Sequence, residues 1–240
     1  MSKANFNEIL KKEIARIDDA SINKRNERVI EGFTDDPSPR AIIKGKKYLL
    51  FNSNDYLGLR FHEKVRKAEE EASKKYGAGP GAVRFISGTM KIHKDLEKEI
   101  AKFHGREDAL IFSSAFAANL AVIHCLIKGQ SRDSVVGKDT LVISDELNHR
   151  SIIDGIRVAG LGKEQKAIFR HMDTEDLKEV LDNNKSHFKR VVIVSDGIFS
   201  MLGEYQNIKK LQTVVDTFDD KYEEGVISVV DDAHGVGCFG

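Results

Sequence analysis

From residue 109 onward, short apolar runs rich in Val, Ile and Leu alternate with longer stretches whose apolar residues recur at helical spacing. The runs have the length of strands, and strands that alternate with helices form right-handed βαβ units and a mainly parallel sheet. We therefore expect an α/β fold, a three-layer sandwich with helices on both faces of the sheet. The predicted strands span 109–112, 141–144, 166–169, 191–195 and 226–231, and the predicted helices span 116–127, 150–159, 174–183 and 207–220.

The last predicted strand leads into chemically active residues. Residues 226–230 are apolar apart from one serine, as expected of a strand that is covered on both faces, and Asp231 and His234 follow them. Ligands of parallel α/β sheets bind beyond the carboxyl ends of the strands. An acid and an imidazole at this edge therefore indicate a functional site.

The composition is that of an ordinary globular protein, with 40% hydrophobic and 32% charged residues. Lys+Arg and Asp+Glu balance at 38 each, so the net charge gives no reason to expect a nucleic acid or a membrane surface as partner. Cys125 and Cys238 form neither a metal-type spacing nor a disulfide framework, which suits a reducing compartment. The charged N-terminus lacks an apolar signal core, and we predict a cytoplasmic location.

One uncharged window, 109–127, is long enough to span a membrane on length alone. Its polar side chains, among them Ser113, Ser114 and Asn119, would each need a hydrogen-bond partner in lipid. We therefore interpret the window as a buried strand, a loop and a helix, and expect no membrane association.

The first 45 residues differ in pattern from the remainder. Leu10, Ile14 and Ile17 have helical spacing within residues 3–20, and a linker with Pro37 and Pro39 follows. We predict an N-terminal helical arm and linker over 1–45 and one large domain over 46–240.

Several short motifs are each weak evidence for a functional site. Gly235–Gly240 matches G-x-G-x-x-G, but no helix follows it, so a dinucleotide site is a remote alternative. Residues 113–119 begin a helix after a strand, where backbone N–H groups attract phosphate, although a simple serine cap is the plainer interpretation. His149 and Asp196 each follow a strand and could equally be packing or capping residues.

Taken together, these motifs favour a site. Four successive strand ends carry a phosphate-type loop, an imidazole, a Ser/Asp turn and an acid followed by a histidine, all at one edge of the sheet. No zinc spacing and no G-x-S-x-G element is present in the sequence, so we predict no metal site and no serine-hydrolase site.

Six motifs in register make the chain similar to the α-oxoamine synthases, the pyridoxal-phosphate-dependent group of the aspartate aminotransferase fold (fold type I). The resemblance runs from about residue 45 to the end. The Val83–Thr89 motif leans toward the 2-amino-3-ketobutyrate CoA ligase (glycine C-acetyltransferase) branch. The motifs are Asn52–Leu59, Val83–Thr89 with His93–Glu97, Ser113–Asn119, Asp145–Gly155, Asp196–Met201 and Val230–Gly237.

The resemblance implies roles for four residues around the cofactor ring. Asp231 would keep the pyridine nitrogen protonated, so that the ring can accept electrons from a carbanion. His149 would stack on the ring face. His234 and Ser200 would lie beside the phenolic oxygen.

The resemblance also implies how the remaining groups are held. The backbone amides of Ala115 and Phe116 would bind the cofactor phosphate, and Asn54 would help to hold the substrate carboxylate. The implied reaction condenses an amino acid, glycine in the first instance, with a short acyl-CoA and releases CoA. Alternatives are a sister synthase that uses a longer acyl-CoA, of the 8-amino-7-oxononanoate synthase or serine palmitoyltransferase type, and a non-catalytic fragment or paralogue.

Two features of the family have no counterpart here. The Schiff-base lysine of a Thr-x-x-Lys-type segment and the small C-terminal domain would both lie beyond Gly240. We therefore expect the large domain to be incomplete at its C-terminus and this segment alone to be inactive. Because family members are dimers, a homodimer is implied as well.

Overall fold

The computed structural model describes residues 3–25, 27–185 and 187–238. The chain forms two compact units, Met1–Asn54 and Asp55–Gly240. The predicted boundary after residue 45 stays a prediction.

The first unit contains a helix and a small antiparallel sheet. Helix α1 (Lys3–Asp19) agrees with the helical spacing within residues 3–20, and all of its side chains are at least partly exposed. Strands β1 (Gly32–Phe33), β2 (Ala41–Ile43) and β3 (Lys46–Tyr48) pair in the order β1-β2-β3. Lys44 and Gly45 connect β2 to β3 with φ of 50° and 70°, the left-handed conformations that a two-residue hairpin turn requires.

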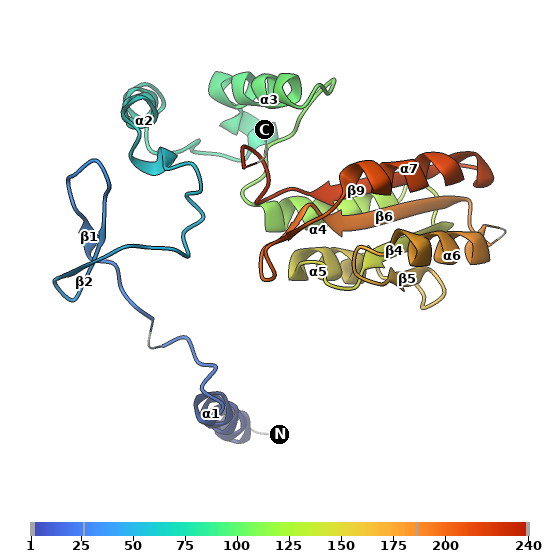
Figure 1. Cartoon of the computed structure of the whole chain (residues 1–240), viewed down its shortest axis with the longest axis horizontal. Helices are drawn as coiled ribbons and strands as arrows, with labels where there is room; N and C mark the ends of the chain where they lie inside the picture. The colour runs from blue at the N-terminus through green and yellow to red at the C-terminus, as the bar shows by residue number, and fades with distance from the viewer. Residues whose placement is uncertain (1–2, 26, 186, 239–240) are drawn as a thin grey trace. The chain divides into compact units, whose positions relative to one another are not determined.

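The second unit is built on a four-stranded parallel sheet with the order β5-β4-β6-β9 (Figure 1). Its strands are β4 (Thr140–Asp145), β5 (Lys166–Phe169), β6 (Arg190–Asp196) and β9 (Val226–Asp231). These four strands were predicted from the apolar runs, and they are confirmed to within about one residue. The central strands β4 and β6 are buried along almost their whole length, which explains why their middle residues, 141–143 and 191–194, are all apolar.

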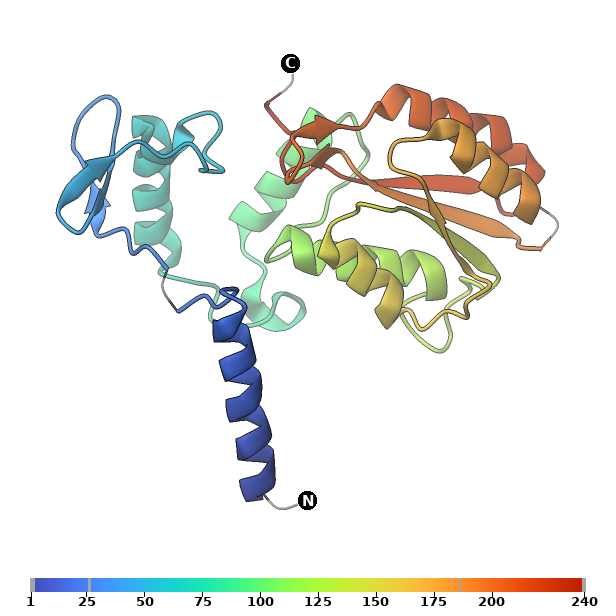
Figure 2. The same ribbon diagram turned by 60° about the horizontal axis from the view of Figure 1, so that its bottom comes forward.

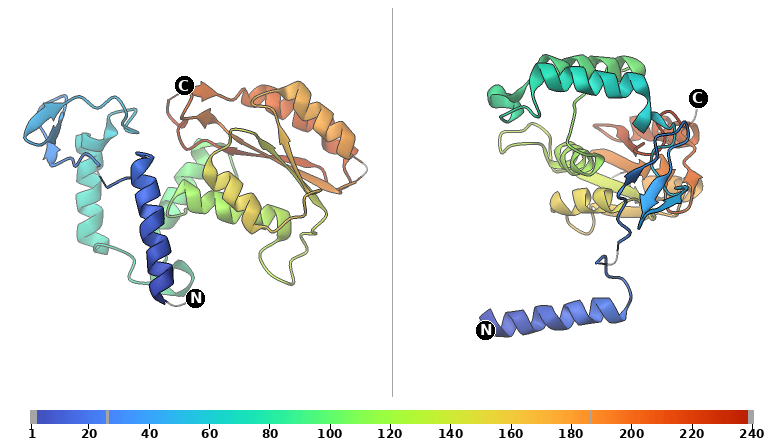
Figure 3. Two further views of the ribbon diagram at one scale, coloured as in Figure 1. Left: turned by 90° about the horizontal axis from the view of Figure 1, so that it is seen from below. Right: turned by 90° about the vertical axis from the view of Figure 1, so that its left-hand side faces the viewer.

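Helices cover both faces of this sheet, as Figure 2 and the left view of Figure 3 show. Helices α4 (Ala115–Lys128) and α5 (Arg150–Val158) pack on one face, and α6 (Thr174–Asn184) and α7 (Ile208–Phe218) pack on the other. Alternate residues of each strand serve the two faces: Ile193 packs under α6 and α7, whereas Val192 and Val194 pack under α4 and α5. The predicted three-layer sandwich is therefore confirmed.

The remaining elements of the second unit lie outside the four-stranded sheet. They are the 3₁₀ turns Leu59–Phe61 and Asp219–Lys221, the π-helical turn Arg84–Gly88, helices α2 (Glu63–Tyr76) and α3 (Lys91–Phe103), and the hairpin of β7 (Ile198–Phe199) with β8 (Glu204–Tyr205).

The predicted strand 109–112 is wrong. The segment has no regular secondary structure and belongs to none of the sheets formed by the described residues, and Leu110 is 66% exposed. The N–H of Ile111 instead donates to Oε1 of the buried Glu97 at 3.2 Å. Arg84 Nη1 and Lys94 Nζ donate to the same carboxylate at 2.6 and 2.7 Å, and these bonds lower the pKa of Glu97 to about 2. An apolar run becomes a strand only where a neighbouring strand accepts its backbone hydrogen bonds.

The uncharged window 109–127 consists of this irregular segment, a short loop and most of α4. None of the helices in the described part of the chain is long and apolar enough to cross a membrane.

Replacing a fully buried strand residue should destabilise the second unit strongly. Ile193→Ala removes a side chain with no exposed surface, and we expect a loss of about 2–5 kcal/mol in the free energy of unfolding. Ile168→Ala is the matched control because Ile168 is 67% exposed on β5, and its loss should be within about 1 kcal/mol. Urea denaturation measures both, and equal losses would contradict the assignment of Ile193 to the core.

Candidate functional site

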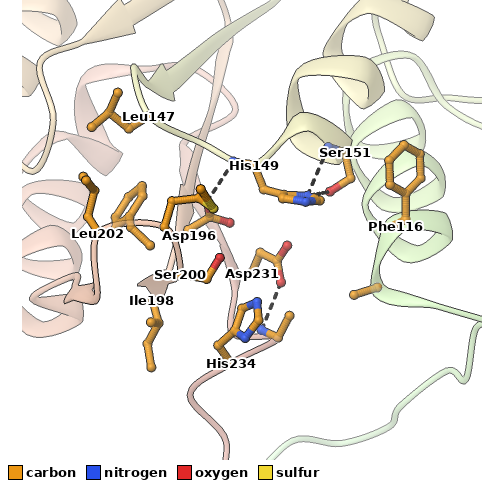
Figure 4. Close-up of a pocket in the computed structure, with 14 residues that line it drawn as sticks. Phe116, Leu147, His149, Ser151, Asp196, Ile198, Ser200, Leu202, Asp231 and His234 are labelled. Carbon is orange, nitrogen blue, oxygen red and sulfur yellow. Dashed lines mark hydrogen bonds between the residues drawn. The ribbon is translucent and has the colours of Figure 1, made fainter. Parts of the chain in front are cut away.

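A cavity of about 300 Å³ lies where the carboxyl ends of β6 and β9 meet the N-termini of α4 and α5 (Figure 4). All six residues for which the sequence predicts a cofactor role line this cavity. Asn54, the predicted substrate-binding residue, belongs to the other unit, so its role stays a prediction. The lining residues are Ala115, Phe116, Leu147, His149, Ser151, Asp196, Ile198, Phe199, Ser200, Met201, Leu202, Asp231, Ala233 and His234.

Asp231 is the last residue of β9, and its carboxylate is held at both oxygens. Oδ1 accepts a hydrogen bond from the N–H of Ala233 at 3.0 Å, and Oδ2 accepts one from Asn119 Nδ2 at 2.7 Å. Both donors are neutral groups, so the negative charge of the carboxylate is oriented toward the cavity without being cancelled.

His149 is the N-cap residue of α5 and is anchored through its backbone and its ring. Its N–H donates to Asp196 Oδ2 at 2.7 Å, and its Nδ1 lies 2.7 Å from Ser151 Oγ. The N–H of Ser151 also donates to Nδ1 at 3.2 Å, so this nitrogen acts as an acceptor and the cap of the helix is satisfied. The ring of Phe116 meets the imidazole edge to face, with the ring centroids 6.4 Å apart.

Asp196 ends β6 directly beside Asp231, because the two residues are paired in the parallel register of β6 and β9. Burial raises the pKa of Asp196 to about 6. The hydrogen bond from the His149 N–H lowers this pKa, and the nearby charge of Asp231 raises it further. Its own N–H donates to Oδ1 of the buried Asn148 at 2.8 Å. Asp196 is thus a structural acid that fixes the start of α5.

The N-terminus of α4 offers an anion site beside these side chains. Ser114 caps the helix by accepting a hydrogen bond from the N–H of Ala117 at 3.1 Å. The N–H groups of Ala115 and Phe116 belong to the first turn, where an α-helix supplies no acceptor of its own. Both residues line the cavity, so these groups and the positive end of the helix dipole suit a phosphate there.

His234 and Ser200 complete the polar lining from two loops. His234 Nδ1 lies 2.7 Å from the hydroxyl of Tyr56, which belongs to the Asn52–Leu59 motif. Ser200 follows β7 in the β7–β8 hairpin. His171 ties this hairpin to the sheet, since its Nδ1 lies 3.0 Å from Asp145 Oδ1 and its Nε2 lies 3.0 Å from Glu204 Oε2.

The donor set suits a cofactor of defined chemistry. A carboxylate fits a protonated ring nitrogen, an imidazole and a hydroxyl fit a phenolic oxygen, and a helix N-terminus fits a phosphate. Pyridoxal phosphate carries all of these groups, so the residues present fit it.

A family model described as "Aminotransferase class I and II" matches residues 46–240. The chain belongs to this family.

The similar proteins indicate one group within the aminotransferase class I and II family. Among the curated relatives are 8-amino-7-oxononanoate synthases from Treponema denticola, 41% identical over 240 residues, and from Thermoanaerobacter pseudethanolicus, 44% identical over 202 residues. These matches cover 100% and 84% of this chain but only 55% and 47% of the relatives. The chain therefore spans about half the length of the curated relatives it matches.

Solved structures agree with the sequence relatives. A variant of serine palmitoyltransferase from S. paucimobilis, with a bound aldimine of pyridoxal phosphate and myriocin, is 28% identical and has a TM-score of 0.75. The match covers 96% of this chain and 52% of that one. Both groups of relatives are α-oxoamine synthases, so the predicted family, fold type and pyridoxal phosphate cofactor are confirmed. The relatives' names favour the predicted alternative, a sister synthase, over the ligase branch.

Three polar residues of the site were missed by the sequence analysis. Asn119, Ser151 and Asn148 are buried and connect the predicted residues to one another. A signal for Asn119 was present, because it precedes Ile123 and Ile127 at intervals of four residues on the buried stripe of α4. A polar side chain on such a stripe needs a buried partner.

Asp196→Asn should stabilise the protein increasingly as the pH rises. Because the folded-state pKa of Asp196 is raised to about 6, the wild type bears the cost of a buried charge as the pH increases from 4 to 7. Asparagine retains an oxygen for the His149 N–H, and we expect a gain on the order of 1–3 kcal/mol at pH 7 that vanishes near pH 4.

Urea denaturation at pH 4, 5.5 and 7 measures this difference. The control is Asp216→Asn, which changes an exposed carboxylate on α7 and should show no such trend. A gain that does not vary with pH would contradict the burial argument for Asp196.

Proposed function

We propose that this chain carries the cofactor-binding part of an α-oxoamine synthase that joins an amino acid to an acyl thioester such as an acyl-CoA. The single observation that carries the proposal is the convergence of Asp231, His149, His234 and Ser200 with the N-terminus of α4 in one cavity. The family match and the relatives' names support the reaction class.

The residue assignments at the cavity follow from the chemistry of each group. Pyridoxal phosphate, when bound, supplies an electron sink for the carbanion formed at the amino-acid Cα. Asp231 would hold the proton on the ring nitrogen, since its carboxylate is oriented by two neutral donors. His149 would pack against the ring face, and the amides of Ala115 and Phe116 would bind the phosphate.

The β7–β8 hairpin and the segment after β9 would hold the phenolic oxygen. Ser200 can donate its hydroxyl hydrogen to that oxygen, and His234 can donate a ring N–H. The contact between His234 and Tyr56 would keep the imidazole turned toward the cavity. Asn54 would bind the substrate carboxylate, as the sequence predicts.

The substrate class can be proposed from the product that names the relatives. In 8-amino-7-oxononanoate, the bond between the ketone carbon and the amine-bearing carbon is the bond that condensation would form. Breaking it leaves alanine without its carboxyl group on one side and a seven-carbon acyl group with a terminal carboxylate on the other. We therefore favour alanine and a long dicarboxylic acyl thioester, with release of carbon dioxide and the thiol, over glycine and a short acyl-CoA.

A substrate screen of the full-length protein tests this choice. Thiol release should be fastest with alanine and heptanedioyl-CoA and slower by at least about tenfold with glycine and acetyl-CoA. The reverse order would place the protein in the ligase branch. Release of no thiol with any pair of amino acid and acyl-CoA would contradict the proposed reaction class.

We also propose that the protein acts as a homodimer in the cytoplasm. Phe85, Ile86 and Phe103 are 90%, 71% and 71% exposed in the second unit, which is unusual for isolated surface residues of this size. Both cysteines are free thiols, as in a reducing compartment. A monomer in sedimentation equilibrium of the full-length protein would contradict the dimer.

Asp231→Asn should abolish most of the activity while leaving the fold intact. The amide has the shape of the carboxylate but cannot balance the positive charge of a protonated ring nitrogen, so we expect kcat to fall by about 10²–10³-fold in the full-length protein. Asp216→Asn removes a charge of the same sign from exposed surface and should retain wild-type activity. Wild-type kcat in Asp231→Asn would contradict the role of Asp231.

A further inference from the structure

The amide of Asn119 connects Asp231, proposed to contact the ring nitrogen of the cofactor, with His149, proposed to pack against the ring face. Its Nδ2 donates to Asp231 Oδ2 at 2.7 Å and to Ser151 Oγ at 2.9 Å. Ser151 Oγ in turn lies 2.7 Å from His149 Nδ1. A continuous chain of hydrogen bonds therefore runs from β9 through α4 to the start of α5.

The positions of the hydrogens in this chain follow from what each group can donate. An amide NH₂ has two hydrogens, and Asn119 uses one toward Asp231 and one toward Ser151. Because Ser151 Oγ accepts from Asn119, its own hydrogen is free to point at His149 Nδ1. Nδ1 also accepts from the N–H of Ser151, so the ring hydrogen is assigned to Nε2.

The two middle members of this hydrogen-bond chain are buried, whereas Asp231 is half-buried and His149 is exposed at the cavity. Ser151 is 1% exposed and Asn119 is 8% exposed. Helices α4 and α5 approach closely at this point, because a Cβ added at Gly155 would lie 3.1 Å from the carbonyl oxygen of Asn119. The glycine thus permits the approach that brings Asn119 within reach of Ser151.

We propose that Asn119 is a positioning residue of the cofactor site, which holds the Asp231 carboxylate in place and, through Ser151, fixes the imidazole of His149 with its hydrogen on Nε2. The inference rests on the proposed function, since it concerns how the same cavity is prepared for pyridoxal phosphate. A neutral amide is suited to this position because it donates twice without adding a charge beside Asp231.

Asn119→Asp tests the proposal with almost no change of shape. The new carboxyl group can donate to Asp231 only while the two acids share a proton, and at higher pH the two carboxylates repel each other. Binding of pyridoxal phosphate to the full-length variant, measured by equilibrium titration, should weaken by about tenfold or more relative to the wild type at pH 8 and recover toward the wild-type value at pH 6. Equal or tighter binding at pH 8 than at pH 6, relative to the wild type, would overturn the proposal.

A second set of variants separates positioning from general structural damage. Asn119→Ala should weaken binding by a similar factor, and the combination with Ser151→Ala should be less than additive because both members belong to one chain. Gln206→Ala is the matched control, since Gln206 is equally buried and its amide donates to Ser195 Oγ at 3.1 Å without touching Asp231. It should destabilise the fold yet bind pyridoxal phosphate within about twofold of the wild type.

The outcomes distinguish this proposal from the proposed function. If the wild type binds pyridoxal phosphate and Asn119→Ala binds it as tightly as Gln206→Ala, only the role of Asn119 is overturned. Strict additivity of Asn119→Ala and Ser151→Ala would overturn the link to His149. Failure of the wild type to bind pyridoxal phosphate would overturn both proposals.

Discussion

The arrangement of the second unit depends on satisfying buried and half-buried carboxylates at the carboxyl edge of the sheet. Asp145, Asp196 and Asp231 end three adjacent strands, and an unpaired carboxylate in such a position would be costly. Each acid has a different set of partners: Asp145 accepts from the N–H groups of Leu147 and Met172, Asp196 accepts from that of His149, and Asp231 accepts from Asn119 and Ala233. The loops and helix starts around the cavity are arranged by these bonds.

The same bonds give the three acids different chemical roles. Asp145 is bound by backbone groups and by His171, so it secures the β7–β8 hairpin that carries Ser200. Asp196 is buried with a raised pKa, and it accepts the hydrogen bond from the N–H of His149, the N-cap residue of α5. Asp231 also lines the cavity but is less buried than Asp196, and both of its oxygens accept from neutral donors, which suits a partner for a cationic ring nitrogen. Identical residue types in equivalent positions of a sheet thus differ through their neighbours.

Local sequence patterns predicted the structure correctly where tertiary contacts agreed with them, and incorrectly where a strand needed a neighbouring strand that is not there. Residues 141–143 and 191–194 are apolar because both faces of their strands are covered, so these runs predicted strands correctly. Residues 109–112 have the same kind of pattern, yet Ile111 bonds to Glu97 rather than to a strand. The Val83–Thr89 motif favours the ligase branch, whereas the relatives are named as sister synthases. One motif is weak evidence for a branch, because branches that share a fold and a cofactor chemistry differ at few residues.

The α/β class, the N-terminal helix and four of the strands follow from the sequence, because hydrophobic period is a local property. The six residues predicted to bind the cofactor line one cavity, and their roles stay predictions. Only the tertiary structure decided which groups hold those residues. Asn119 and Ser151 lie 32 positions apart in the sequence, and Asn119 and Asp231 lie 112 apart, so no local pattern records that they meet. Their contacts exist because α4 and α5 pack closely on the same face of the sheet and bring buried donors to buried acceptors.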